Sequence, residues 1–227
     1  MGYPMNEKLQ KEYVLRIIEG KESLVIPICD DNGAGIGAMR PITKMHLQSD
    51  DVIEKMTNWR NQYKMFFLTQ FNATPARTKQ WLEKVVLSNP SQLLFLIYYG
   101  ERLMGQYGFK ELDGDSAFLD NLLRGERGGH PLLMKYAVLA LIGWLFDVME
   151  VNTVYGYAFA NNAMALKLNR EVGFSCTEKI PLVKQVEGEE IKWVVGKAGE
   201  LSPDNHYYQK IVMSCNPQMR KPLTSQG

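Results

Sequence analysis

The stretch that decides the fold is Ser116–Met149, SAFLDNLLRGERGGHPLLMKYAVLALIGWLFDVM. It begins with a short apolar run, Ala117–Leu123, that is typical of a β-strand. A glycine-rich turn, Arg124–His130, comes next, and the apolar segment Pro131–Phe146 after it has the length of a helix. Glycines let backbone N–H groups point inward, and the first turn of a helix adds free donors and the positive end of its dipole. This order predicts either a site for a phosphate or pyrophosphate, or a plain strand-to-helix connection.

The overall composition is that of an ordinary globular protein. The 227 residues are 45% hydrophobic and 22% charged, which suits one large domain, with or without a small extension. A net charge of +1 gives no electrostatic reason to bind nucleic acid or an acidic membrane surface, so we expect neither partner.

The cysteines and the apolar runs predict a cytoplasmic location. Cys29, Cys176 and Cys215 lack the spacing of metal ligands, so we expect free thiols in a reducing compartment and no bound metal. The first residues lack the features of a secretion signal, and the longest apolar run, Ala137–Phe146, is too short to span a bilayer.

The rest of the chain predicts an α/β fold, a mixed sheet flanked by helices, in three parts. Residues 1–37 form an extension with a β-hairpin, whose strands are Tyr13–Ile18 and Ser23–Ile28, followed by a mobile loop over 30–37. Residues 38–215 form the main domain, and residues 216–227 a flexible tail. The main domain begins with a strand at Ala38.

Polar caps and apolar periodicity place the other elements of the main domain. Helices are expected after Ser49, after Thr74 and after Asn162, the last one ending at Gly173. Besides the central strand, the expected strands cover residues 92–99, 102–112, 152–160, 174–184, 191–197 and 207–214.

Two motifs in this order resemble those of the GCN5-related N-acetyltransferase (GNAT) superfamily, over Met39–Ser214. LLRGERGGHPLL, at 122–133, is similar to its acyl-CoA pyrophosphate loop, R-G-x-G-x-G/A, with Arg127 in place of the middle glycine. NAMALKLNREVGF, at 162–174, is similar to N-x-x-A-x-x-L-Y-x-x-x-G-F, with Asn169 in place of the tyrosine. The resemblance implies a GNAT-like fold and transfer of an acyl group, acetyl or a short hydroxyacyl, from acyl-CoA to an amine.

The resemblance also assigns residues to acyl-CoA, which acts as co-substrate. The central strand would bind the pantetheine arm through its backbone, and the glycine turn would receive the pyrophosphate. N–H groups near Leu122 could polarise the thioester carbonyl. The residues assigned to the coenzyme are Leu122, Leu123, Arg124, Arg127, Gly128, Gly129, His130, Asn162 and Asn169.

The catalytic candidates are Asp120, Asn121 and Asn169. An amine that attacks a thioester must lose a proton, and a carboxylate on the central strand, Asp120, is the natural acceptor. A water chain could replace it, and Asp120 could instead act as a cap or pair with a neighbouring arginine. Strand alternation predicts that Asn121 points to the opposite face. Because Asn169 is a poor proton donor, the thiolate either leaves unprotonated or takes a proton from a hydroxyl such as that of Tyr155 or Tyr157.

Within the superfamily, NWRN at 58–61, followed by Phe66–Phe67, resembles the branch that acylates nucleotide-linked amino sugars. The acceptor would be an amino-deoxysugar on a nucleoside diphosphate, as in bacterial surface-polysaccharide (O-antigen, lipopolysaccharide) synthesis. Cationic and aromatic side chains suit its diphosphate and base. The residues expected to bind it are Trp59, Arg60, Asn61, Tyr63, Arg77 and Trp81. The alternatives are an enzyme that acylates protein N-termini and a non-catalytic acyl-CoA-binding module; a homodimer is compatible with either.

Overall fold

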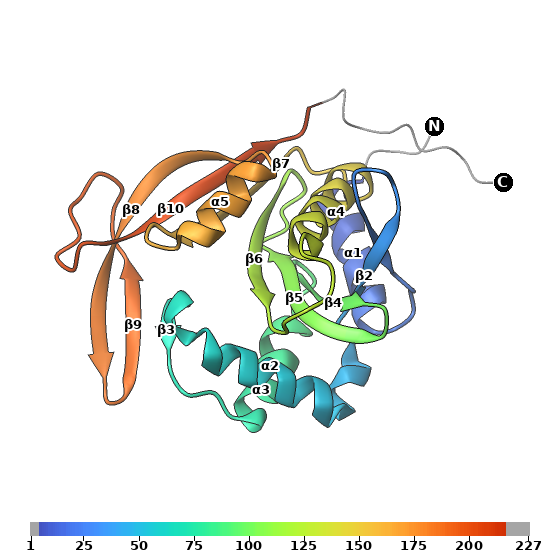
Figure 1. Ribbon diagram of the computed structural model, residues 1–227, viewed down its shortest axis with the longest axis horizontal. Helices are drawn as coiled ribbons and strands as arrows, with labels where there is room; N and C mark the ends of the chain where they lie inside the picture. Colours follow the sequence, from blue (N-terminus) through green and yellow to red (C-terminus); the bar gives the residue numbers. More distant parts are fainter. Residues whose placement is uncertain (1–4, 217–227) are drawn as a thin grey trace.

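A computed structural model of the protein describes residues 5–216 and shows one mixed β-sheet flanked by helices (Figure 1). The helices are α1 (Glu7–Ile18), α2 (Asp50–Gln62), α3 (Pro75–Trp81), α4 (Leu133–Asp147) and α5 (Ala163–Glu171). The strands are β1 (Ile26–Cys29), β2 (Gly35–Pro41), β3 (Thr69–Gln70), β4 (Leu93–Tyr99), β5 (Arg102–Lys110), β6 (Ser116–Arg124), β7 (Thr153–Phe159), β8 (Ser175–Glu187), β9 (Glu190–Val195) and β10 (His206–Ser214). The predicted α/β class is confirmed.

The sheet has the strand order β1-β2-β4-β5-β6-β7-β10-β8-β9-β3. Its neighbouring strands are antiparallel except for β6 and β7, which are parallel and are connected through α4. The core lies between α4 and the sheet, where Phe95 and Phe109 pack against Trp144 with ring centroids 6.0 and 6.1 Å apart. In the view of Figure 1, α2 and α3 lie below β4–β6 and next to β3.

The N-terminal segment differs from the prediction. Tyr13–Ile18 is not a hairpin strand but the second half of α1, which Asn6 caps by accepting the N–H of Leu9 at 3.1 Å. Val14, Ile17 and Ile18 are buried, which is a helical spacing of i, i+3 and i+4, whereas the sequence shows only a short, nearly continuous apolar run that a strand would also fit.

The observed hairpin joins β1 to β2, with register from Ile26–Met39 to Cys29–Gly35. The carboxylate of Asp30 shapes its turn by accepting the N–H groups of Asn32 and Ala34, both at 2.9 Å. The expected loop is therefore short, because β2 already begins at Gly35.

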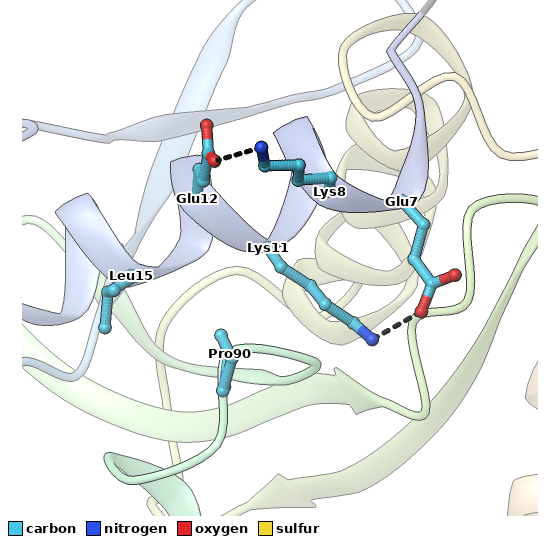
Figure 2. A pocket seen from close by; sticks show the side chains of 6 residues that line it. All are labelled: Glu7, Lys8, Lys11, Glu12, Leu15 and Pro90. Carbon is cyan, nitrogen blue, oxygen red and sulfur yellow. Dashed lines mark hydrogen bonds and ion pairs between the residues drawn. The ribbon is translucent and has the colours of Figure 1, made fainter.

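α1 is fastened to the body of the domain. The amide of Gln10 donates to the carbonyls of Met149 at 2.5 Å and Gly114 at 3.2 Å, and Tyr13 stacks on Trp144. The outer face of α1 bears a hollow of about 400 Å³ lined by Glu7, Lys8, Lys11, Glu12, Leu15 and Pro90 (Figure 2). Its charged side chains pair with one another, Lys8 with Glu12 and Lys11 with Glu7, so we assign no site to it.

The strands and helices expected in residues 38–215 are found within a few residues of their predicted limits. The structure contains one further strand that the sequence did not predict, β3. This strand has only two residues, too few for a sequence pattern, and pairs with β9. Residues 217–227 of the expected tail lie outside the described residues. Within residues 5–216, no helix combines the length and apolar character needed to cross a bilayer.

Candidate active site

The two parallel strands at the centre of the sheet separate along their length. Ser116–Phe118 of β6 pair with Thr153–Tyr155 of β7, and the pairing ends there. Beyond this point β6 stays paired with β5 up to Arg124, and β7 stays paired with β10 up to Phe159. The carboxyl ends of β6 and β7 therefore diverge (Figure 1), which leaves backbone groups on both strands for an extended ligand between them.

β6 carries a β-bulge in the middle of this opening. Leu123 pairs with Gln106 and Asp120 with Gly108, so Asn121 and Leu122 together face Tyr107. Asn121 has a φ of 59°, in the left-handed region that asparagine tolerates better than most residues. The simple alternation expected for β6 is therefore wrong at this point, because the bulge inserts an extra residue.

Asp120 and Asn121 line the same small cavity rather than opposite faces of the strand. The cavity has a volume of about 110 Å³ and lies between the end of α3 and strands β4–β6. Its wall includes Trp81 and Val85 from α3 and the π-helical turn after it, and Lys110 from β5. It is large enough for a few water molecules.

The carboxylate of Asp120 is held from two sides. One oxygen lies 2.8 Å from the ammonium group of Lys110, and the other accepts the N–H of Asn121, also at 2.8 Å. The sequence left open that Asp120 pairs with a neighbouring arginine; the observed partner is a lysine instead. The side chain is still 37% exposed, so the carboxylate remains accessible to a substrate or water.

Several titratable groups lie around Asp120. Burial raises the pKa of the Tyr107 and Tyr208 phenols, and the charge of Asp120 raises each pKa further. Burial lowers the pKa of Arg60 to about 10, and the nearby charge of Arg77 acts in the same direction, while Asp120 opposes it. Charged and titratable groups on α2, α3, β5, β6 and β10 therefore influence one another's pKa values at this end of the opening between β6 and β7.

The glycine turn after β6 has the backbone that an anion site needs. Gly128 and Gly129 have φ values of 88° and 72°, which glycine adopts without strain. α4 begins after Leu132, whose side chain cannot cap it, so the N-terminal N–H groups of α4 lack a side-chain acceptor at this position. The loop residues 127–129 are exposed.

Arg124 shapes this loop from within. Its guanidinium donates to the carbonyls of Gly128 at 2.6 Å, Glu126 at 3.3 Å and Pro131 at 3.4 Å. These donors are occupied by the chain, so Arg127 is the arginine of the motif that is free to reach an anion. Nδ1 of His130 accepts the N–H of Leu132 at 3.3 Å, which places His130 at the start of α4.

Two residues expected to touch the acceptor support the site instead. Trp59 is 2% exposed, and its Nε1–H donates to a carboxylate oxygen of Glu126 at 3.0 Å. Asn61 makes two bonds with the backbone of Ala73, donating at 3.0 Å and accepting at 2.7 Å. The sequence placed both correctly on α2 but could not show that their partners lie within the chain.

Arg60 and Arg77 agree better with the role expected of them, which is binding of the acceptor. The guanidinium of Arg60 stacks on Phe67 at 3.6 Å from the ring centroid and donates through Nη2 to the carbonyl of Thr69 at 2.6 Å. Its Nη1 is buried and has no partner among the described residues. Arg77 stacks on Phe71 at 3.8 Å and pairs with Glu190 of β9 at 2.9 Å.

The other two residues expected to bind the acceptor, Trp81 and Tyr63, lie in different places. Trp81 lines the cavity beside Asp120. Tyr63 is half-buried at the end of α2, where its hydroxyl accepts from the side chain of Gln62 at 3.2 Å.

A row of aromatic side chains, which the sequence reasoning missed, crosses β6, β7, β10 and β9. Consecutive members have ring centroids between 4.2 and 5.6 Å apart; they are Phe118, Tyr157, Tyr208, Phe159, His206 and Trp193. Nε1 of Trp193 is buried without a partner among the described residues. A feature of the sequence could have revealed part of this row: aromatic residues alternate along β7, and alternating residues of a strand lie on the same face.

The two asparagines of the α5 motif also have roles in the structure of the protein. Asn162 caps α5 by accepting the N–H of Ala165 at 3.1 Å, and Asn169 is 8% exposed. Tyr155 cannot readily serve as the acid in place of the missing tyrosine. Its hydroxyl donates to Glu111 at 3.2 Å, and burial, followed by the charge of Glu111, raises its pKa to about 12.

Residues 38–175 match the family described as Acetyltransferase (GNAT) domain. This match covers more than half of the chain, and the protein therefore belongs to the GNAT acetyltransferase family. It is an enzyme that uses acyl-CoA as co-substrate. No curated protein sequence matches the chain.

Solved structures with the same fold include several N-acetyltransferases. PseH from Campylobacter jejuni, in complex with acetyl coenzyme A, has 17% identity and a TM-score of 0.52, over 78% of this chain and 99% of that one. RimL, a ribosomal L7/L12 alpha-N-protein acetyltransferase in complex with coenzyme A, has 12% identity and a TM-score of 0.55, over 84% and 98%. Spermidine N-acetyltransferase from Vibrio cholerae, with CoA and spermine, has 12% identity and a TM-score of 0.58, over 79% and 95%. At these identities the likeness shows the fold alone.

In residues 5–216 no three His, Cys, Asp or Glu side chains are grouped as metal ligands.

Proposed function

We propose that the protein transfers an acyl group, acetyl or a short hydroxyacyl, from acyl-CoA to the amine of an amino-deoxysugar linked to a nucleoside diphosphate. The observation that carries this proposal is Arg60. Arg60 is half-buried, and its Nη1 is a buried charged donor without a partner among the described residues, which is costly unless something binds it; an anionic group of the acceptor would supply the missing acceptor atoms. The diphosphate of a nucleotide sugar has that chemistry.

Charge separates this acceptor from a polyamine. Arg60 and Lys110 lie near the carboxylate of Asp120, and Arg77 lies near Arg60; Arg77 and Lys110 each already pair with one carboxylate. A polycation would bring like charges to this region, which is unfavourable. An acidic acceptor gains from the same groups.

Aromatic surface favours a nucleotide over a protein N-terminus. The members of the row other than the buried Phe159 are half-buried, and their rings are of the kind on which a base or a sugar packs. A peptide acceptor would instead need an open groove with backbone partners. The segment that contains β3 pairs with β9 at the edge of the sheet, so the backbone of β9 is already engaged there.

The chemistry assigns each group a place. Asp120 accepts the proton of the attacking ammonium group, directly or through water in the adjoining cavity, and the amine forms a C–N bond with the thioester carbon. N–H groups at the bulge, near Leu122, stabilise the oxyanion. The C–S bond then breaks, the nitrogen loses its second proton to solvent as the amide forms, and the coenzyme leaves as a thiolate. The thiolate takes its proton from solvent or from the hydroxyl of Tyr157, since neither Asn169 nor Tyr155 is a suitable acid at neutral pH.

On the coenzyme side, the backbone of Leu122 and Leu123 would hold the pantetheine arm in the opening between β6 and β7. The pyrophosphate would lie on the N–H groups of residues 127–130 and on the guanidinium of Arg127. Asn162 and Asn169 on α5 would border the same opening. Acyl-CoA and nucleotide sugars are both metabolites of the cytoplasm, where we place the enzyme; a homodimer is compatible with this reading.

The test is thiol release from acetyl-CoA with three kinds of acceptor: thymidine- and uridine-diphosphate amino sugars, spermidine, and a peptide with a free N-terminus. The proposal predicts release with one or more nucleotide sugars at a kcat/KM roughly 100-fold or more above the other two. Release with the peptide alone would establish the protein N-terminal enzyme, and release with none of the acceptors, despite binding of acetyl-CoA, would favour a non-catalytic module.

Arg60→Met adds the residue-level test. It keeps the apolar contact with Phe67 and removes the charge, so the KM for the sugar nucleotide should rise about tenfold or more, with the affinity for CoA unchanged. The matched control is Arg16→Met on α1, whose guanidinium pairs with Glu22 on the surface away from the opening. Equal effects of the two variants would refute the assignment of Arg60.

A further inference from the structure

The aromatic row crosses one face of the sheet and ends on β9. It starts at Phe118, two residues before Asp120 on β6, and alternation along the strand puts both side chains on the same face. It ends at Trp193, whose ring centroid lies 4.2 Å from that of His206. The row therefore leads from the carboxylate where the amine would react to the hairpin of β8 and β9.

The backbone of β9 lies beside the segment that holds Arg60, since β9 and β3 are neighbours at the edge of the sheet (Figure 1). The N–H of Trp193 donates to the carbonyl of Leu68 at 2.7 Å, and Nη2 of Arg60 donates to the carbonyl of the next residue, Thr69, at 2.6 Å. Because neighbouring carbonyls of a strand point to opposite edges, Trp193 and Arg60 lie on either side of this segment. One strand spacing and one hydrogen bond separate the backbone of Trp193 from the guanidinium, roughly 8–10 Å. The ribose of a nucleotide joins the base to the phosphates over a distance of this order.

Both flanking side chains carry a buried donor that lacks a partner among the described residues. These donors are Nη1 of Arg60 and Nε1 of Trp193. Within residues 5–216 the other buried side-chain atom without a partner is the amide oxygen of Gln10, which is an acceptor. A buried N–H that bonds to nothing costs free energy, and a ligand that accepts from it removes that cost. The two unpartnered donors therefore point to one ligand that extends across both sides of Leu68–Thr69.

The end of the row has the chemistry of a surface for an uncharged ring. Burial lowers the pKa of His206 below its ordinary value, against the opposing charge of Asp204, so the imidazole is neutral at pH 7. His206 and Trp193 are both half-buried, and each leaves part of its ring to a ligand. Val195, two residues after Trp193 and thus on the same face, adds an apolar side chain that is 48% exposed.

The order of groups along this face matches the order of groups in a nucleotide-linked amino sugar. Asp120 lies where the amine reacts. Arg60, whose pKa responds to the charge of Asp120, comes next and has the chemistry to bind the diphosphate. The rings of His206 and Trp193 lie beyond Arg60, on the other side of Leu68–Thr69, where the base would be.

We infer that the end of the aromatic row is the subsite for the base of the acceptor nucleotide: the base packs against the rings of His206 and Trp193, and Nε1 of Trp193 donates to one of its carbonyl oxygens. Thymine and uracil carry such oxygens and adenine carries none, so the subsite selects a base of the first kind. The presence of a nucleotide rests on the proposed function. Both residues lie beyond residues 38–175, which match the family, so membership of the family assigns them no role.

The test compares two probes by calorimetry, thymidine diphosphate and inorganic pyrophosphate, on the full chain saturated with coenzyme A so that the coenzyme's own phosphate site is filled. The native protein should bind thymidine diphosphate about tenfold or more tightly than pyrophosphate, and more tightly than adenosine diphosphate. Trp193→Leu should weaken binding of thymidine diphosphate about tenfold and change that of pyrophosphate by less than about twofold. Arg60→Met should weaken binding of both probes.

Two further variants separate the indole from the fold of the hairpin. Trp193→Phe keeps a ring and removes the N–H, so it should weaken binding of thymidine diphosphate by about threefold. Val183→Ala is the matched control: Val183 pairs with Val194, the neighbour of Trp193, and so lies on the opposite face of the same hairpin. It should bind both probes like the native protein.

The outcomes distinguish the subsite from the proposed function. An unchanged affinity of Trp193→Leu for thymidine diphosphate would overturn the subsite and leave the acceptor as proposed. Equal affinities of the native protein for thymidine diphosphate and pyrophosphate would overturn the subsite too, because nothing would then bind the base. Loss of both probes in Trp193→Leu and Trp193→Phe would assign Trp193 to the fold and likewise overturn it. If neither probe binds the native protein, the subsite and the proposed acceptor are both wrong.

Discussion

Replacement of Gly125 by alanine tests the contact between the pyrophosphate loop and α2. A Cβ at this position would lie 1.9, 2.1 and 2.3 Å from three atoms of the Trp59 indole. Carbon atoms in contact are ordinarily about 3.5–4.0 Å apart, so the ring or the loop would have to move by roughly 1.5 Å. Neither moves easily, because Trp59 is 2% exposed and the loop is bonded to Met104.

The expected cost follows from this geometry. Overpacking a well-filled site costs about 1–3 kcal/mol, and the fixed neighbours place Gly125→Ala near the upper value. For a domain of this size each kcal/mol lowers Tm by about 2–4 °C, so Tm should fall by about 6–12 °C. The affinity for coenzyme A should fall as well, because the displaced segment leads into residues 127–129.

The assay is thermal unfolding followed by circular dichroism, with coenzyme A titrations of the folded protein. Gly143→Ala is the matched control: it lies inside α4 with nothing within 4 Å of its Cβ position, so alanine should stabilise the helix by about 0.5–1 kcal/mol. A Tm for Gly125→Ala within 2 °C of the native value, on the order of a 1 kcal/mol change or less, would refute the contact.

Four further predictions concern the acceptor site, the coenzyme site and the phenol of Tyr155. Arg60→Met should change Tm little, since the cost of burying the charge, which lowers the pKa of Arg60 to about 10, is relieved while the bond to the carbonyl of Thr69 is lost; a clear fall on thermal unfolding would make this arginine structural. Asn61→Ala should lose about 1–2 kcal/mol in urea unfolding, because Ala73 loses two partners, and an unchanged midpoint would contradict this. Asp120→Asn should lower kcat by about 100-fold or more with little effect on coenzyme affinity, whereas Arg127→Ala should weaken coenzyme binding more than turnover; identical kinetic profiles would discard both roles. The pKa of Tyr155 is raised to about 12 in the folded protein, so its contribution to stability is fully present below pH 10 and is lost as the pH rises toward 12; Tyr155→Phe should flatten the fall of Tm over that range, and an identical fall in both proteins would contradict it.

The sequence predicted the central part of the fold well because its signals there are local. Apolar runs, caps and glycine turns identify β6, α4 and α5 within a few residues, and Asn162 forms the expected cap. The N-terminal helix was missed because the apolar residues of Tyr13–Ile18 form a short, nearly continuous run, and such a run fits a strand as well as a helix.

The site was less predictable because it depends on contacts across the chain. The bulge at Asn121 arises from the register between β5 and β6, and no local pattern announces it. Trp59 and Asn61 are on the expected helix, but only the fold shows that Glu126 and Ala73 engage them. The aromatic row likewise needs the order of β7, β10 and β9 before its members become neighbours.

A crystal structure of the enzyme with coenzyme A and thymidine diphosphate tests the central claim most directly. The account predicts the pyrophosphate of the coenzyme on the N–H groups of residues 127–130, its pantetheine arm between β6 and β7, and the phosphates of the nucleotide against the guanidinium of Arg60. A nucleotide bound elsewhere, with Arg60 still unpartnered, would contradict the proposed acceptor. Coenzyme A bound outside the opening between β6 and β7 would contradict the account as a whole.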